Sequence, residues 1–204
     1  MSTWTSKPAS AGLILSLALV AGCDLAPGMG PASRGKAMTQ AALAEGAVVV
    51  AMPFGYCIDP RSIRRDFAMA ARCDLLGVDG PVAAGQPVAI LTAATAAIAQ
   101  GAATPDPETL AASIEDAQVL QKGVRDGFPM IQVAARRAPV DGLSDRHWRT
   151  AFVAGGQIVA LALYAPQGSE ALGPEGTFLL ADAARATREA TTVRLPAARA
   201  RTAN

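Results

Sequence analysis

The sequence predicts an α+β domain with a mainly antiparallel sheet and a C-terminal helix packed on it. Two segments, His147–Val153 and the largely apolar Gln157–Tyr164, flank a Gly-Gly pair that suits the positive backbone torsions of a tight hairpin turn. The segment Glu175–Glu189 has apolar residues spaced to place one helix face on that sheet. Strands that outnumber helices and follow one another in hairpins are typical of this class. The apolar helix positions are Phe178, Leu179, Ala183 and Ala186.

Other elements are predicted by local patterns. The β-branched run Ala47–Met52, apolar on both faces, predicts a strand in the centre of a sheet. Asp126-Gly127 predicts a turn between two strands. For the small residues 93–101 the pattern does not decide between a short helix and a loop. The remaining predicted elements are a helix at Gln40–Glu45, a strand at Pro87–Thr92, a helix at Pro107–Ser113, and strands at Gln118–Lys122 and Met130–Arg136.

Composition excludes some function classes. The chain has 204 residues, with 18 basic and 17 acidic side chains, and this balance argues against a general nucleic-acid binder. Aromatic residues make up only 4%, so platforms that stack bases or sugars are not expected. The core must therefore consist mostly of Ala, Val, Leu and Ile.

The N-terminal segment has the parts of a secretory signal. Lys7 precedes the apolar run Ala11–Ala21, which is shorter than the roughly 20 residues that cross a bilayer as a helix. The run ends in Val20-Ala21-Gly22-Cys23, which resembles the lipobox, the recognition site of bacterial lipoprotein signal peptidase. The resemblance implies that residues 1–22 are removed and that Cys23 is lipidated.

The same resemblance implies an organisation and a location. We expect a signal peptide at 1–22, a lipidated flexible tether at 23–40, a single domain at 41–190 and a polar, fraying tail at 191–204. Two or three acyl chains on Cys23 make a firm membrane anchor. The protein is then expected on the cell membrane or the outer membrane, facing the periplasm. Asp24 resembles an inner-membrane retention signal of enteric bacteria, but the choice of membrane stays open.

Lipidation of Cys23 leaves Cys57 and Cys73 as an even pair in an oxidising compartment, which predicts a disulfide bond between them. A loop of about 15 residues closed in this way contributes roughly 3 kcal/mol to stability. Free or redox-active thiols are the alternative. A metal centre has little support, because His147 is the only histidine and the chain has no Cys-x-x-Cys spacing. No cofactor is expected.

The disulfide constrains the segment between its cysteines. Asp59 and Pro60 suit the N-cap and first position of a helix. A helix continuing to Arg72 would be about 18 Å long, whereas the Cα atoms of bonded cysteines lie within about 7 Å. We therefore expect a short helix, Pro60–Asp66, and an extended segment, Phe67–Cys73, although the Ala-Met-Ala-Ala run favours a helix.

Charged residues gather around this stapled segment, so Pro53–Cys73 is the predicted working surface. Arg64 and Arg65 are expected on the solvated side of a helix, where Asp59 and Asp66 are near enough to balance them. The alternative is that the arginines form an anion-binding lip for a phosphate headgroup or an acidic glycan. The candidate ligand or partner contacts are Tyr56, Asp59, Arg61, Arg64 and Arg65.

An enzymatic site is harder to find. Asp145 and His147 lie two residues apart on a predicted strand, so the carboxylate is placed to orient the imidazole as a general base. The chain has no Gly-x-Ser-x-Gly setting to supply a nucleophile beside them. We therefore assign no catalytic residue, and expect His147 on the surface or in a turn.

These observations favour a lipid-anchored envelope lipoprotein that acts as a non-enzymatic binding or structural module. Its expected partners are the membrane, through the lipid, and an envelope protein or glycan. The alternative is an envelope hydrolase or a thiol-redox enzyme that uses Cys57 and Cys73. The closing hairpin and long helix resemble small envelope lipoproteins with a PsbP-like sandwich, a likeness of fold that implies no activity.

Overall fold

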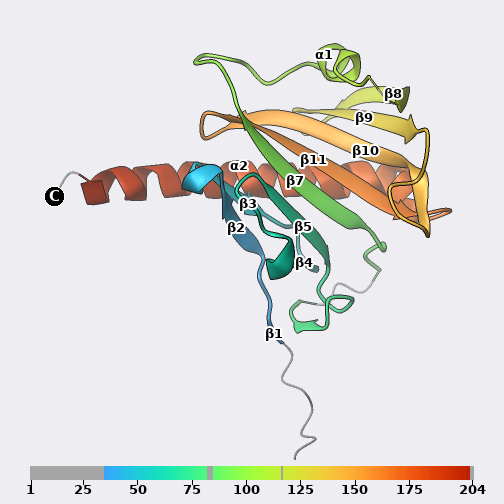
Figure 1. Ribbon diagram of the computed structural model, residues 1–204, viewed down its shortest axis with the longest axis horizontal. Coiled ribbons are helices and arrows are strands. Elements are labelled where there is room, and N and C mark those ends of the chain that lie inside the picture. Colours follow the sequence, from blue (N-terminus) through green and yellow to red (C-terminus); the bar gives the residue numbers. More distant parts are fainter. Residues whose placement is uncertain (1–34, 82–84, 116, 203–204) are drawn as a thin grey trace, which may run out of the picture. The chain divides into compact units, whose positions relative to one another are not determined.

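A seven-stranded antiparallel sheet forms the centre of the computed structural model, which describes residues 35–81, 85–115 and 117–202. The strand order is β4-β5-β7-β11-β10-β9-β8 (Figure 1). The predicted signal peptide, Cys23 and most of the predicted tether lie outside the described residues. In sheet order the strands are β4 (Tyr56–Ile58), β5 (Phe67–Arg72), β7 (Ile90–Ala97), β11 (Gln157–Pro166), β10 (Leu143–Ala154), β9 (Phe128–Ala135) and β8 (Ala117–Arg125).

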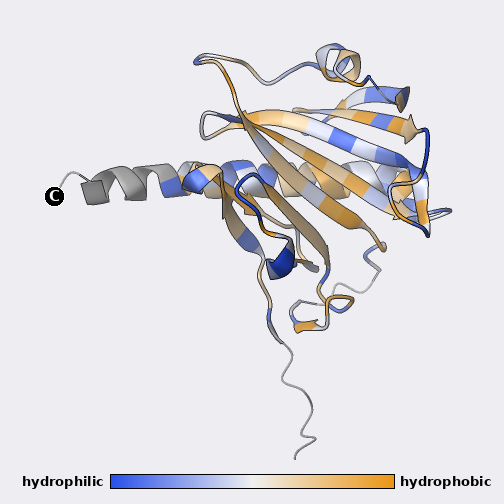
Figure 2. Ribbon diagram, in the orientation of Figure 1, coloured by the Kyte–Doolittle hydropathy of each residue, from blue (hydrophilic) through white to orange (hydrophobic). Residues whose placement is uncertain are grey.

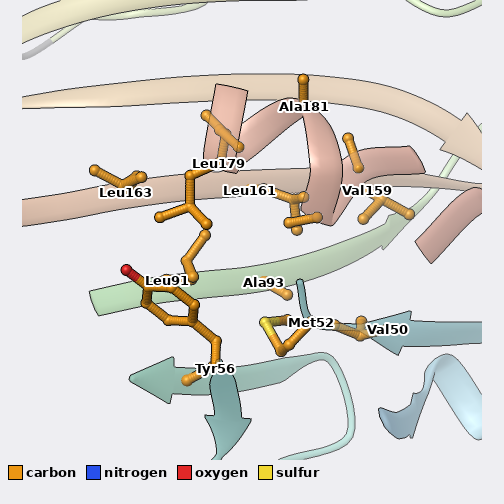
Figure 3. Close-up of a cluster of buried hydrophobic side chains, with 14 of the residues drawn as sticks. Val50, Met52, Tyr56, Leu91, Ala93, Val159, Leu161, Leu163, Leu179 and Ala181 are labelled. Carbon is orange, nitrogen blue, oxygen red and sulfur yellow. The ribbon is translucent and has the colours of Figure 1, made fainter. Parts of the chain in front are cut away.

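Helices cover both faces of this sheet. The long helix α2 (Pro174–Thr202) crosses one face, and the main hydrophobic core lies beneath it (Figure 1). Figure 3 shows side chains of this core, including Leu91 of β7, Leu161 of β11 and Leu179 of α2. The short helix α1 (Pro107–Ala112) buries Leu110 in a smaller cluster on the opposite face, with Ile131, Val133 and Ala151. The strands at the middle of the sheet, β7 and β11, are accordingly apolar along most of their length (Figure 2).

Helix α2 starts so close to the sheet that only glycine fits at one position. A Cβ atom on Gly176 would lie 1.9 Å from the carbonyl oxygen of Ala171 and 2.9 Å from Cδ1 of Trp148. Ala171 belongs to a 3₁₀ turn, η3 (Glu170–Leu172), that joins β11 to the helix. The close approach of Gly176 to Trp148 limits the distance between the start of α2 and β10.

Four short strands pair outside the main sheet. The hairpin β2 (Gln40–Leu43) and β3 (Val48–Ala51) is antiparallel, and β1 (Gly35–Lys36) pairs in parallel with β6 (Val78–Asp79). A 3₁₀ turn, η1 (Ala44–Gly46), closes the hairpin. All four residues of β3 are buried, which is unusual for a strand with a partner on one side only.

Two threonines of α2 hydrogen-bond to the edge of β3 that does not pair with β2. The backbone N–H groups of Val49 and Ala51 donate to the hydroxyl oxygens of Thr191 and Thr187, at 3.0 and 3.1 Å. Each hydroxyl donates in turn to the carbonyl oxygen of the same residue, at 3.4 Å for Thr191 and 3.2 Å for Thr187. Because threonines four positions apart share one helix face, both reach the strand edge and satisfy its buried polar groups.

The predicted fold class is confirmed, and so are the features with a specific turn or cap signature. The β10–β11 hairpin turns at Gly155 and Gly156, with φ of 59° and 73°. The β8–β9 hairpin turns at Asp126-Gly127. Helix α1 begins at Pro107, where the side chain of Asp106 accepts the Thr109 N–H at 2.7 Å. The strand predicted at Ala47–Met52 is β3.

Four predictions about the first part of the chain are wrong. Gln40–Glu45 forms β2 and the start of η1 rather than a helix, and β3 pairs only with β2 instead of lying within the main sheet. The strand predicted at Pro87–Thr92 begins at Ile90 and continues to Ala97, so the small residues 93–97 form neither helix nor loop, and only residues 98–101 form a loop. In each case the apolar pattern does not distinguish the two states, and strand pairing decides between them.

The C-terminal boundary also differs from the prediction. Helix α2 continues through the expected polar tail to Thr202, and Thr191, the first residue of that tail, is buried against β3. Phe178, expected on the packed face, is instead 51% exposed under the guanidinium of Arg125, 4.0 Å from its ring centroid. At the other end, Gln40 belongs to β2 and not to a tether.

We predict that removing the Thr187 and Thr191 hydroxyls lowers stability by more than the net contribution of their hydrogen bonds, because the buried backbone groups of β3 lose their partners. The double substitution Thr187→Val and Thr191→Val keeps the side-chain volume and leaves the N–H and C=O groups of Val49 and Ala51 buried without partners. The free energy of unfolding is expected to fall by about 2–5 kcal/mol. Urea denaturation of the mature chain measures the change.

Thr192→Val is the matched control, because Thr192 is exposed and its hydroxyl bonds only to the Arg188 carbonyl of the same helix. Its effect is expected within about 0.5 kcal/mol. An equal loss of stability in both variants would show that the strand edge does not need the hydroxyls.

Candidate functional site

The predicted disulfide joins Cys57 and Cys73, with the Cα atoms 4.8 Å apart. Cys57 lies in β4 and Cys73 directly follows β5, so the bond closes the hairpin that these strands form. Both cysteines are completely buried. As the disulfide argument predicts, residues Phe67–Arg72 are extended, and only a 3₁₀ turn, η2 (Pro60–Ser62), is helical between the strands. The buried side chains of β5 are those of Ala68 and Ala70.

Tyr56 is a core residue and not a surface contact. Its side chain is fully buried, and its hydroxyl donates to the Pro87 carbonyl oxygen at 2.5 Å. Burial raises the pKa of the Tyr56 hydroxyl to about 12, against the opposing effect of the Arg72 guanidinium. The hydroxyl therefore stays protonated and holds the Pro87 segment against β4, so the prediction of a ligand contact at Tyr56 is wrong.

The other predicted contacts remain on the surface but are engaged separately. Asp59 accepts the Arg61 backbone N–H at 3.0 Å and the Arg61 Nε–H at 3.2 Å, and these bonds lower the pKa of its carboxyl. Arg64 donates to two backbone carbonyls of its own loop, those of Arg61 and Ile63. Arg65 pairs with Glu45 at 2.9 Å. The structure thus brings Asp59 and Arg61 together, and directs Arg64 and Arg65 to other partners.

A buried histidine lies on the opposite side of the sheet from α2. His147 is 1% exposed and stacks on the ring of Tyr164, with centroids 4.6 Å apart. Its Nδ1 lies 3.3 Å from the backbone carbonyl oxygen of Asp145, and its Nε2 lies 2.8 Å from Nε of Arg149. Because Nε of Arg149 can only donate, Nε2 is the acceptor and the ring proton is on Nδ1.

This environment keeps His147 neutral. Burial, and next the positive charge of Arg149, lower the pKa of the imidazole to about 4. The partner on Nδ1 is the carbonyl of Asp145 rather than its carboxylate, so the predicted orienting role of that side chain is not observed. The expectation of a surface histidine is also wrong. With its lone pair bonded to Arg149, the ring orients a guanidinium instead of accepting a proton from a substrate.

Arg149 faces an open pocket of about 360 Å³ between the end of α1 and β8–β10. The residue is half-buried, and its guanidinium forms no ion pair with any carboxylate of the described residues. Glu115, on the same pocket wall, is exposed. The other lining residues are Ser113, Ile114, Ala117 and Ala135.

The sequence did not single out Arg149. It occupies one of the alternating positions of a strand, where an arginine is ordinary. The signal that could have identified it is the spacing His147-x-Arg149, since residues two apart on a strand share a face.

A second groove, of about 540 Å³, lies between the β2–β3 hairpin and α2. Val49, Ala51, Ala186 and Ala190 make much of it apolar, and Glu189 and Arg194 add one charge of each sign. The described residues that line it include no cysteine, serine or histidine, so the groove resembles a packing surface more than a catalytic site.

Within the described ranges, no group of three or more His, Cys, Asp or Glu side chains is arranged to hold a metal ion. Among those residues, too, no helix has the length and apolar character to cross a bilayer.

No family model and no curated protein sequence matches the chain. Among solved structures, the chain is similar to LpqN of Mycobacterium tuberculosis, a protein involved in cell envelope biogenesis. The two are 15% identical in sequence, and the match covers 70% of this chain and 80% of LpqN. The TM-score of 0.25 is too low for the likeness to support a conclusion about fold or function.

We predict that His147 makes stability pH-dependent between its ordinary pKa and the lowered one. The unfolded chain binds a proton near pH 6.5 and the folded chain only near pH 4, so protonation favours unfolding in this window. The free energy of unfolding is expected to fall by up to about 3 kcal/mol as the pH drops from 7 to 4. Urea midpoints measured across this range follow the loss.

His147→Gln supplies an uncharged side chain that can accept from Arg149, and it is expected to flatten the profile in that window. The carboxyls with lowered pKa values, those of Asp59, Asp74 and Asp106, affect both proteins alike at lower pH. An unchanged slope in the variant would contradict the assignment of the titration to His147.

Proposed function

We propose that the chain is a bacterial lipoprotein, anchored through Cys23 on the periplasmic face of a membrane, and that it works as a binding module. The observation that carries the anchor is the apolar run that ends in Val20-Ala21-Gly22-Cys23. The Cys57–Cys73 disulfide supports export, because structural disulfides persist in oxidising compartments.

Two features favour binding over catalysis. Thiol–disulfide exchange needs a thiolate to reach a sulfur atom, and both sulfurs of the buried Cys57–Cys73 pair are enclosed. A hydrolase built on His147 would need a free imidazole lone pair, which Arg149 occupies. The disulfide is therefore a structural link in this proposal, and His147 a positioning residue.

We place the ligand contact at Arg149 instead of the Pro53–Cys73 loop. An arginine fork matches the two oxygens of a carboxylate, and a half-buried guanidinium without a carboxylate partner has N–H groups to offer one. His147 fixes Nε, which directs the remaining N–H groups of Arg149. Glu115 on the rim suits a ligand that carries a hydroxyl or ammonium group beside its acid. The proposed ligand is an envelope component that presents a carboxylate.

The anchor predicts a defined mature terminus. The protein is expected to fractionate with membranes, and its N-terminal peptide to begin at Cys23 and carry the mass of the acyl groups. Cys23→Ser removes the sulfur that takes the lipid, so this variant is expected to keep residues 1–22 and lose the acyl mass. Mass spectrometry of the purified protein checks both. A mature terminus without acyl mass in the unmodified protein would refute the anchor.

The ligand site predicts a difference between two arginines. Arg149→Met removes the charge from the pocket, whereas Arg61→Met removes an 89% exposed charge from the loop favoured by the sequence. Quantitative pull-down from detergent-solubilised envelopes is expected to lose the bound component at least tenfold with Arg149→Met, and not with Arg61→Met. The thermal unfolding midpoint of each variant verifies folding. The reverse pattern would assign the contact to the Pro53–Cys73 loop.

A further inference from the structure

Phe54 and Leu75 form an exposed apolar tip at one end of the β4–β5 hairpin. Their exposed fractions are 66% and 58%. Phe54 lies just before β4 and Leu75 just after β5, and the Cys73 N–H donates to the Gly55 carbonyl at 3.0 Å. This bond places the two loops side by side, and each loop carries one large exposed apolar side chain.

The tip is held rigidly from within. The Cys57–Cys73 disulfide joins the two strands behind it. Arg72 pairs with Asp74 at 2.6 Å, which neutralises the carboxylate next to Leu75. Arg72 also donates to the Gln86 carbonyl oxygen at 3.0 Å. Side chains presented on such a support lose little conformational freedom when they are buried by a binding partner.

The chain arrives from the proposed anchor at this same end. Strand β1, Gly35–Lys36, pairs with β6, Val78–Asp79, and only a short turn separates β6 from Leu75. Eleven residues separate Cys23 from Gly35, and the twelve steps along the chain span at most about 43 Å. The lipid anchor therefore limits how far this end can move from the bilayer.

We propose that the tip inserts Phe54 and Leu75 into the headgroup region of the bilayer that holds the acyl chains of Cys23. The inference rests on the proposed lipid anchor. A tether this short raises the local concentration of the tip at the membrane, so two apolar side chains suffice where a free protein would need more. Lys36 is exposed in β1, where the chain enters the domain, and its positive charge attracts this end to anionic headgroups.

Tryptophan fluorescence of the full mature lipoprotein tests the insertion. The sequence has tryptophan only at positions 4 and 148; the first lies in the predicted signal, and the second is buried and gives a constant background. Leu75→Trp places a reporter at the tip. In vesicles of phosphatidylethanolamine and phosphatidylglycerol, its emission is expected to shift to the blue and to be quenched at least twofold by brominated phospholipids.

Val124→Trp is the matched control, because Val124 is 63% exposed and lies on β8, at the opposite edge of the sheet from β4 and at the opposite end of the strands. Its emission is expected to stay that of a solvated indole. In the Leu75→Trp background, Phe54→Ser is expected to reduce the quenching by at least half, and Val124→Ser, at a 63% exposed position of β8, to leave it unchanged.

Each other outcome overturns the insertion. Equal quenching at positions 75 and 124 would mean that lipid approaches without preference for the tip. A blue shift at position 75 without quenching would mean that a second copy covers it. Absence of both effects in a protein whose Cys23 is acylated by mass would reject the tip and leave the anchor intact. Absence of acylation is measured separately and counts against the anchor itself.

Discussion

The lateral packing of α2 on the open edge of β3 is the contact on which the rest of the fold depends. The β2–β3 hairpin does not belong to the main hydrogen-bonded ladder, yet its second strand is completely buried. Burying a strand edge without partners is costly, since each orphaned N–H or C=O loses its hydrogen bonds to water. Thr187 and Thr191 meet this cost with hydroxyls that both accept and donate. One helix therefore holds the hairpin and covers the large sheet.

The two faces of the sheet differ: one carries the main hydrophobic core, and the other is only partly covered. Under α2 the sheet builds its core from Leu, Val, Ala and two phenylalanines, Phe128 and Phe152, in edge-to-face contact with centroids 5.2 Å apart. On the other face α1 covers only part of the strands, and the uncovered part holds the His147–Arg149 pair. The neutral imidazole of His147 accepts the hydrogen bond from Arg149, a role in which a carboxylate is more usual. It positions the guanidinium without neutralising it, so the positive charge remains available in the pocket.

How far the sequence could predict this structure depends on the kind of signal. Glycine pairs, Asp-Gly and Asp-Pro caps restrict the backbone locally, and those turns and helix starts were predicted correctly. The extended course of Phe67–Cys73 followed from the reach of a disulfide, against the helix propensity of its residues. Alanine-rich segments such as Gln40–Leu43 and the second half of β7 have no local preference, and only their strand partners decide their state.

The candidate site was less predictable, because its properties are tertiary. Tyr56 looked like a contact residue beside arginines, but its ring completes the core and its hydroxyl finds a carbonyl 31 positions away. His147 resembled a solvated residue among charged neighbours, and Tyr164, from the adjacent strand, encloses it. The pocket at Arg149 needs α1, β8 and β9 to exist at all. Apart from His147-x-Arg149, which puts two side chains on one strand face, no spacing along the chain indicates these contacts.

The bonds between β3 and α2 also determine when the molecule can finish folding. They join residues 136 and 142 positions apart, so the first buried strand of the domain waits for its last helix. Such distant pairings form late because a long loop must close before they contribute. In the export proposed above, the domain would therefore complete its fold only after Thr187 and Thr191 had crossed the membrane, when almost the whole chain has passed.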